Sequence, residues 1–242
     1  MVILYVSAMT LQSPTVLITG ACGNLGRAVA KLFTDRGASL VLLDRDAATL
    51  AAAFGADDDR RMSLAADLLD ATSVAAAVGK ARARFGGIDV LCNLAGGFKM
   101  GESVHETSDA TWDFMLGLNA RSILHTARAV VPLMLAAGRG SIINVGAGAA
   151  ARGGANMGAY SASKSAVARL TESMSAELRE RGINVNCVLP SIIDTPENRK
   201  DMPKADPSRW VAPHDLALVI AFLASDAARA IHGASVPVSG LS

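Results

Sequence analysis

Short apolar runs alternate with amphipathic helical stretches along almost the whole chain, and this alternation is the strongest constraint on its fold. The runs are residues 15–19, 40–43, 88–93, 142–145, 183–189 and 235–238. Largely apolar runs are typical of parallel strands that are buried on both faces, and helical crossovers between them indicate a doubly wound arrangement. The alternation therefore predicts a single-domain, Rossmann-like α/β fold, with a parallel sheet of about seven strands and helices on both faces.

Composition restricts the function more than the fold. The 242 residues are 51% hydrophobic and 19% charged, which excludes a disordered chain and allows one sizeable core. The net charge is +1, and the Lys and Arg residues are scattered rather than gathered into a basic stripe. We expect a small-molecule substrate, no nucleic-acid partner and no membrane partner.

The cysteines and histidines do not form the pattern of a metal site or a disulfide framework. They are Cys22, Cys92 and Cys187, and His105, His125, His214 and His232. The cysteines are odd in number and include no Cys-x-x-Cys pair, and the histidines share no ligand spacing. We expect no metal, packing or surface roles for these side chains, and a reducing, cytoplasmic location.

The two least regular parts of the sequence are its beginning and a proline-rich segment near its end. Residues 1–8 are apolar, but they have no basic flank and are too short to cross a bilayer. We interpret residues 1–13 as a disordered leader or an extended translation start, and residues 14–242 as the domain. Residues 192–212 form a long irregular segment, which we interpret as a substrate lid because such segments in compact domains are usually functional.

A glycine-rich turn joins the first apolar run to a helical stretch. The turn reads Gly20-Ala-Cys-Gly-Asn24-Leu25-Gly26. Glycines let the backbone approach a pyrophosphate closely, and the free N–H groups at a helix start bind negative charge, so we expect a dinucleotide here. Asn24 stands where a glycine is usual; because asparagine tolerates a positive φ, we expect the loop to keep its shape.

Asp44 ends the second run, about 20 residues after the turn, where an acid binds the adenosine ribose hydroxyls. A carboxylate at this place repels a 2′-phosphate, which favours NAD over NADP. Two alternatives stay open. Arg45 could bind such a phosphate, and Asp44 could instead cap the following helix.

Tyr160 and Lys164 lie four residues apart, and so on one face of a helix. The pKa of a tyrosine hydroxyl is ordinarily near 10, and a neighbouring ammonium group lowers it toward the operating pH. We therefore predict that Tyr160 is a general acid/base and that Lys164 lowers its pKa. An ordinary amphipathic helix also fits the segment, but it requires neither residue.

These features together resemble the short-chain dehydrogenase/reductase family over residues 15–239. The motifs that carry the resemblance are the glycine turn, Asp67-Leu68, Asn93-Leu-Ala95-Gly96, Asn119, Tyr160-Ser-Ala-Ser-Lys164, and Pro190 with Thr195. The resemblance implies hydride transfer with NAD, or less readily NADP, and a homotetramer or homodimer with an interface from residues 112–134 and 159–181. It also implies that Lys164 holds the nicotinamide ribose and that Asn119 positions a proton-relaying water.

The resemblance assigns the site residue by residue. The catalytic residues are Asn119, Tyr160 and Lys164, and the cofactor contacts are Gly20, Asn24, Leu25, Gly26, Asp44, Asp67, Leu68, Asn93, Ala95, Gly96, Tyr160, Lys164, Ile193 and Thr195. The chain departs from the family at Ala147, where most members carry a serine that polarises the substrate carbonyl. Residues 144–151 contain no hydroxyl side chain. Losing one such donor costs roughly 10²–10³ in rate. Ser191, which replaces the family's glycine after Pro190, is a candidate substitute.

A narrower resemblance is to the dihydropteridine reductases, which also lack the serine. It rests on residues 95–98, on residues 146–150 with Gly158-Ala-Tyr160, and on the lid up to Trp210, whereas residues 101–131 resemble the general family. Three functions stay open. The first is hydride transfer between NAD(H) and a small carbonyl, alcohol or quinonoid substrate, the second is reduction of a quinonoid pterin, and the third is a catalytically inactive dinucleotide-binding sensor or scaffold.

Overall fold

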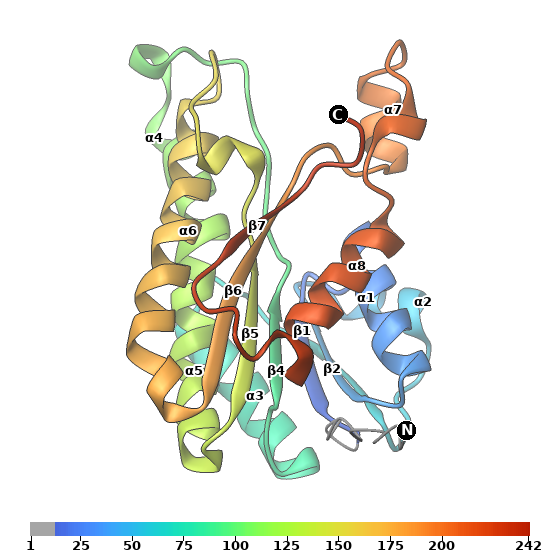
Figure 1. The fold of residues 1–242 in the computed structure, drawn as a ribbon. Helices are drawn as coiled ribbons and strands as arrows, with labels where there is room; N and C mark the ends of the chain where they lie inside the picture. The colour runs from blue at the N-terminus through green and yellow to red at the C-terminus, as the bar shows by residue number, and fades with distance from the viewer. Residues whose placement is uncertain (1–12) are drawn as a thin grey trace, which may run out of the picture.

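Seven strands pair in parallel in one sheet, in the order β3-β2-β1-β4-β5-β6-β7 (Figure 1). They are β1 (Thr15–Thr19), β2 (Ser39–Asp44), β3 (Arg61–Ala65), β4 (Val90–Asn93), β5 (Gly140–Val145), β6 (Ile183–Pro190) and β7 (Ser235–Val238). The order reverses between β1 and β4, and parallel α/β sheets bind ligands beyond the carboxyl ends of the strands at such a point. This computed structural model, which describes residues 13–242, confirms the expected doubly wound fold.

The apolar runs predict six of these strands, and β3 is the one that they miss. β3 is half-buried along most of its length and pairs only with β2, at the edge of the sheet. An edge strand of this kind does not need the continuous apolar run by which buried parallel strands are recognised. Apart from Ser13, the expected leader lies outside the described residues.

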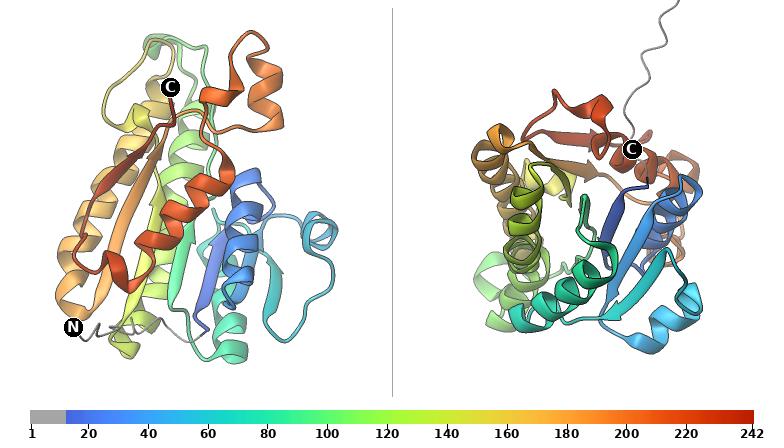
Figure 2. Two further views of the ribbon diagram at one scale, coloured as in Figure 1. Left: turned by 45° about the vertical axis from the view of Figure 1, so that its right-hand side comes forward. Right: turned by 90° about the horizontal axis from the view of Figure 1, so that it is seen from below.

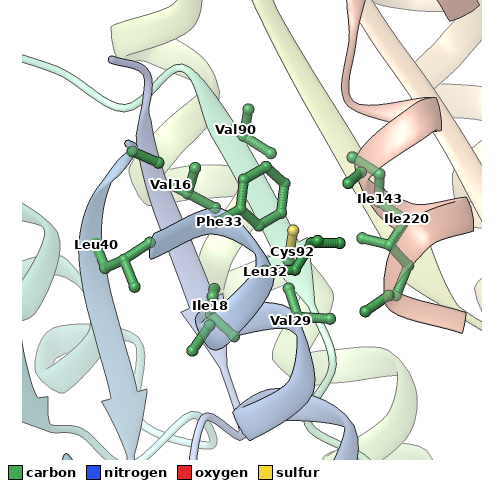
Figure 3. Packing of buried hydrophobic residues seen from close by; sticks show 14 of the residues in the cluster. Val16, Ile18, Val29, Leu32, Phe33, Leu40, Val90, Cys92, Ile143 and Ile220 are labelled. Carbon is green, nitrogen blue, oxygen red and sulfur yellow. The ribbon is translucent and has the colours of Figure 1, made fainter. Parts of the chain in front are cut away.

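Helices cover both faces of the sheet (Figure 2). One face carries α1 (Asn24–Asp35), α2 (Ala47–Phe54) and α8 (Pro213–Leu223), and the other carries α3 (Ala71–Phe85), α4 (Asp109–Leu116), α5 (Ser122–Ala137) and α6 (Gly158–Leu178). On the first face, Val29 and Phe33 of α1 and Ile220 of α8 are buried in one cluster with Ile18 and Cys92 of the sheet (Figure 3). These two packed layers fix where each strand ends.

The segment after β6 contains an ordered helix, α7 (Pro196–Asp201), which stands beside the C-terminus beyond the carboxyl ends of the strands (Figure 1). Thr195 caps its first turn, and the base of the segment is closed by a β-bridge between Ile193 and Val211. Residues 192–212 were expected to be irregular, and the structure shows helical turns with defined hydrogen bonds instead. None of the helices described in residues 13–242 is long and apolar enough to span a membrane.

Candidate active site

The glycine turn has the geometry that a pyrophosphate requires. Gly20 has a φ of 64°, in the left-handed region, and a Cβ added to Gly26 would lie 2.2 Å from the carbonyl oxygen of Gly20. Gly23 precedes α1 without a side-chain cap, so N–H groups at the start of this helix remain for a ligand. These features fit the phosphates of a dinucleotide.

Asn24 is the first residue of α1 and does not adopt a positive φ. Among residues 13–242, the non-glycine residues with positive φ are Ser13 and Asn156, so Asn24 does not use the tolerance of a positive φ on which the expectation for this loop was based. Gly20 takes that conformation instead. The Asn24 Nδ2 donates a hydrogen bond of 2.8 Å to Oε2 of Glu197 and thereby links the glycine turn to α7.

Asp44 is positioned by the turn rather than by the following helix. Its carboxylate accepts hydrogen bonds from the backbone N–H groups of Cys22, at 2.9 Å, and Arg45, at 2.8 Å. The cap of α2 is Asp46, which accepts from the Thr49 N–H, so the capping alternative for Asp44 is wrong. Burial, together with the Asp44 carboxylate, raises the pKa of the Cys22 thiol to about 11.

Asp67 and Leu68, a pair of expected cofactor contacts, follow β3. Asp67 is exposed, and its Oδ1 accepts from the Leu69 N–H at 2.9 Å. Leu68 is buried, and its carbonyl oxygen lies 2.8 Å from Nδ1 of His125, which reaches it from α5. His125 therefore has a packing role, as expected, and it also holds the backbone of this pair.

Two polar side chains hold the turn after β4 in place. Oγ1 of Thr19 accepts from the N–H groups of Leu94 and Ala95, at 3.1 and 3.2 Å. The Asn93 side chain is buried and bonded to Asn144, at 2.8 Å, and to a threonine of α5. The Asn93 side chain thus holds the end of β4 in place. Thr19 is a supporting residue that the sequence did not reveal.

Gly96 brings the expected catalytic side chains together. A Cβ on Gly96 would lie 2.9 Å from Oδ1 of Asn119 and 3.2 Å from Nζ of Lys164. Lys164 is buried, and its ammonium group donates to the carbonyl oxygen of Val145 at 2.9 Å. The end of β5, the turn after β4 and helix α6 therefore converge here.

The electrostatics of the pair differ from the expectation. Burial raises the pKa of Tyr160 above its ordinary value, and burial lowers the pKa of Lys164 to about 8. The prediction that the Tyr160 pKa lies below its usual range is therefore wrong for this structure. Desolvation is the cause of this rise, so the Tyr160 hydroxyl is protonated at neutral pH.

Asn119 lies in a π-helical turn, Gly117–Arg121, between α4 and α5. Its Oδ1 accepts from the Gly97 N–H at 2.8 Å, and its Nδ2 donates to the Gly97 carbonyl and to Oγ of Ser163, at 3.1 and 2.9 Å. The Ser163 hydroxyl in turn donates to the carbonyl oxygen of Tyr160 at 2.7 Å. Ser163 thus couples two expected catalytic residues. The sequence signal for this role of Ser163 is its position between Tyr160 and Lys164 on α6.

Ala147 is buried just after β5 and brings no hydroxyl to the site. The expected substitute, Ser191, donates its hydroxyl proton to the carbonyl of Ser239 at 2.8 Å and lies 2.8 Å from Oγ of Ser242. Ser191 therefore fastens the C-terminal tail, and its expected role as a donor to substrate is wrong in this structure.

Phe98 is a further residue to which the sequence assigned no role. Its ring packs edge-to-face on Tyr160, with ring centroids 4.8 Å apart and an interplanar angle of 89°. Phe98 is 57% exposed although it is large and apolar. In the sequence, Phe98 stands out only as the last residue of the turn at residues 95–98.

Ile193 and Thr195, two of the expected cofactor contacts, lie at the base of α7. Oγ1 of Thr195 accepts from the Asn198 N–H at 3.1 Å, and Nδ2 of Asn198 donates to the Ile193 carbonyl at 2.8 Å. In residues 13–242, no group of three or more His, Cys, Asp and Glu side chains is arranged to hold a metal ion.

Comparisons with known proteins agree on one family. The family described as short chain dehydrogenase matches residues 14–206. The cis-4-hydroxycyclohexanecarboxylate dehydrogenase of Sinomonas cyclohexanicum is 36% identical, over 93% of this chain and 94% of that protein. The D-threitol dehydrogenase of Mycolicibacterium smegmatis is 34% identical, over 95% and 93%.

Solved structures give the same result. The 3-ketoacyl-(acyl-carrier-protein) reductase from Brucella melitensis, complexed with NADH, has a TM-score of 0.85 and 31% identity, over 95% of this chain and 98% of that one. ElxO with NADP bound has a TM-score of 0.87 over 94% and 98%, and at 24% identity it shows a shared fold alone.

Proposed function

The chain belongs to the short-chain dehydrogenase family, and on that premise we propose that it transfers a hydride between NAD(H) and a small carbonyl or alcohol substrate. The observation that carries the proposal is that Asn119, from the π-helical turn, and Lys164, from the helix α6 that also bears Tyr160, converge on Gly96. When bound, the dinucleotide supplies or accepts the hydride. Gly20, Gly26 and Asp44 would hold its phosphates and adenosine ribose.

Tyr160 moves the proton at the substrate oxygen in this proposal. Burial raises its pKa, so at neutral pH the hydroxyl carries the proton that reduction delivers to the substrate oxygen. Lys164 would bind the nicotinamide ribose, with its ammonium group held by the Val145 carbonyl. Asn119, fixed on Gly97 and Ser163, would position the water that relays protons.

A second candidate substrate is a quinonoid ring, including a quinonoid pterin. Ala147 favours it, because a conjugated ring spreads the charge that develops during reduction over several atoms and does not need a hydroxyl clamp on one oxygen. Ala147 also motivates the third candidate, an inactive dinucleotide-binding sensor or scaffold, because a chain without the serine hydroxyl can keep the fold and the cofactor site while lacking turnover.

A substrate panel with NADH and NADPH side by side tests the proposal and separates the three candidates. Ketones and a quinonoid dihydropterin are mixed with enzyme and each reduced cofactor, alcohols are mixed with enzyme and NAD⁺ or NADP⁺, and the nicotinamide absorbance is followed. We expect turnover with at least one ketone or alcohol. If NADH binds with enhanced fluorescence and no member of the panel is turned over, the enzyme proposal fails and the sensor or scaffold is supported.

We propose NAD as the cofactor, since Asp44 lies at the end of β2 with its carboxylate held by two backbone N–H groups. Asp44→Ala should lower discrimination against NADPH by roughly ten-fold, because it removes a carboxylate that repels the 2′-phosphate. Competitive binding of NADH and NADPH measures this. NADPH binding to the unchanged protein as tightly as NADH would contradict the assignment.

We also propose a cytoplasmic homotetramer or homodimer. Trp112, Phe114 and Leu124 leave large apolar side chains exposed on α4 and α5, at 46%, 46% and 38%, which an interface between copies would cover. The three cysteines are free thiols, as a reducing compartment requires. Analytical ultracentrifugation should show two or four chains for the unchanged protein, and Trp112→Glu should shift the mass toward one chain.

A further inference from the structure

The loop after β4 leaves three large apolar side chains in water. Phe98 is 57% exposed, Met100 55% and Val104 76%. Single exposed apolar residues are normal on a protein surface, but three within seven positions of one loop form a patch that marks a binding site. We call these three side chains the apolar rim.

The apolar rim lies against the start of α6, the helix that carries Tyr160. The Gly101 N–H donates to the Asn156 carbonyl at 2.9 Å, just before this helix. A Cβ on Gly158 would lie 2.8 Å from Cγ2 of Val104, and Phe98 packs on the Tyr160 ring itself. The rim is therefore continuous with the group that transfers the proton.

The charged groups of this loop are occupied with one another. Nζ of Lys99 lies 3.2 Å from Oε1 of Glu102, and both side chains bond to Oγ1 of Thr111. Hydrogen bonds from Ser108 and from Lys99 lower the pKa of Glu102, so its carboxylate stays charged and paired with the ammonium group. Neither ion needs a charged or hydroxyl-rich substrate to satisfy it.

The other segment beside α6 is equally apolar. Residues 147–151 supply only alanine and glycine, and Ser165 of α6 donates its hydroxyl back to the carbonyl of Ala150 at 2.9 Å. A substrate that enters beside Tyr160 thus meets the apolar rim and residues 147–151, which bring no polar side chain. A linear polyol would lose hydrogen bonds to water there without replacing them.

We propose that the substrate is an alcohol or ketone on an apolar ring, whose ring packs on Phe98 while its oxygen reaches Tyr160. This rests on the hydride-transfer function proposed above and names its substrate class. Ring pairs in contact contribute beyond simple burial, and covering the apolar rim removes it from water. Phe98 is then the residue that determines specificity for rings.

The test compares one cyclic and one linear ketone, cyclohexanone and erythrulose, with NADH. For the unchanged enzyme, kcat/KM for cyclohexanone should exceed that for erythrulose by at least about ten-fold. Phe98→Ala should raise the KM for cyclohexanone by roughly ten-fold and change its kcat by less than about two-fold. Phe98→Tyr, which keeps the ring, should restore the KM. Phe222→Ala is the matched control, because Phe222 is 45% exposed on α8, which lies across the sheet from α6.

Two kinetic results would overturn the proposal. One is preference for erythrulose. The other is an equal loss of kcat with both ketones in Phe98→Ala, which would mean that Phe98 only positions Tyr160. A binding measurement separates failure of this proposal from failure of the enzyme function. Cyclohexanone with NAD⁺ forms a complex that cannot react, and saturation-transfer NMR reads its binding. Ring signals that vanish in Phe98→Ala support the ring site whatever the activity, and unchanged signals refute it.

Discussion

The cofactor edge of the molecule, built from β1, α1 and β2, and the substrate edge, built from β5, α6 and the segment after β6, solve different problems. At the cofactor edge the groups that would bind the ligand are mostly backbone N–H groups. Glycines stand at Gly20 and Gly26 because backbone atoms lie too close there for a side chain. At the substrate edge the proposed catalytic groups are side chains, namely Tyr160 and Lys164 of α6, joined by Asn119 from the π-helical turn before α5. The comparison teaches that crowding limits substitution at Gly20 and Gly26 of the first edge, whereas the second edge keeps the contacts of Lys164 and Asn119 with an alanine at position 147.

The largest expected effect breaks the cofactor edge. Gly26→Ala places a Cβ 2.2 Å from the Gly20 carbonyl oxygen, so the turn must move. Overpacking costs about 1–3 kcal/mol, and NADH binding should weaken by up to roughly 10²-fold in a fluorescence titration. Gly79→Ala is the control, because Gly79 lies within α3 with no neighbour within 4 Å. It should leave NADH binding unchanged and stabilise the protein slightly. Equal NADH affinity in both variants would contradict the account of this edge.

The sequence predicted the strand, turn and helix of the cofactor edge because backbone requirements leave a clear pattern of residue types. Glycine spacing, a strand before the turn and an acid after the second strand are all local in sequence. The position of Asn24 was the exception. Which residue of the turn takes the left-handed conformation depends on where α1 begins, and element boundaries are poorly determined by sequence.

An intermediate effect sharpens the comparison at the substrate edge. Ala147→Ser returns a hydroxyl to the position where most family members carry one. Since a preorganised donor is worth roughly 10²–10³ in rate, recovering part of it should raise kcat for a ketone by about ten-fold. Steady-state kinetics with NADH measures the gain. A fall in kcat would contradict this expectation and show that the substrate needs an apolar side chain at position 147. For reduction of a quinonoid ring, which does not need the hydroxyl, the kcat of Ala147→Ser should stay close to that of the unchanged enzyme.

The substrate edge was only partly predictable because its properties depend on contacts between distant residues. The spacing of Tyr160 and Lys164 indicated the pair, but burial, which raises the Tyr160 pKa, is set by packing that no local pattern reports. Likewise, Ser163 and Phe98 acquire their roles from contacts with Asn119 and Tyr160. Ser191 illustrates the converse, since its hydroxyl is taken by a tail 48 residues away.

The smallest expected effect concerns stability. Burial lowers the pKa of Lys164 from 10.5 to about 8, so above pH 8 the unfolded chain holds a proton that the folded protein has released. Stability then rises with pH, by at most about 1.4 kcal/mol per pH unit. Urea unfolding between about pH 8 and 9 should show this rise in the unchanged protein and not in Lys164→Met. The window ends there because the buried thiols, whose pKa values are raised, act in the opposite direction above their ordinary 9.0. Parallel slopes in the two proteins would contradict the buried ammonium group.

The central claim is that Tyr160 transfers the proton at a site without the usual serine, and Tyr160→Phe tests it most directly. The variant removes one hydroxyl and keeps the ring that packs on Phe98. With saturating NADH and a ketone that the unchanged enzyme reduces, the single-turnover rate from nicotinamide absorbance should fall by roughly 10² or more. The NADH dissociation constant should stay within about two-fold, because the cofactor edge is untouched. An unchanged single-turnover rate would contradict the claim and remove Tyr160 from the mechanism.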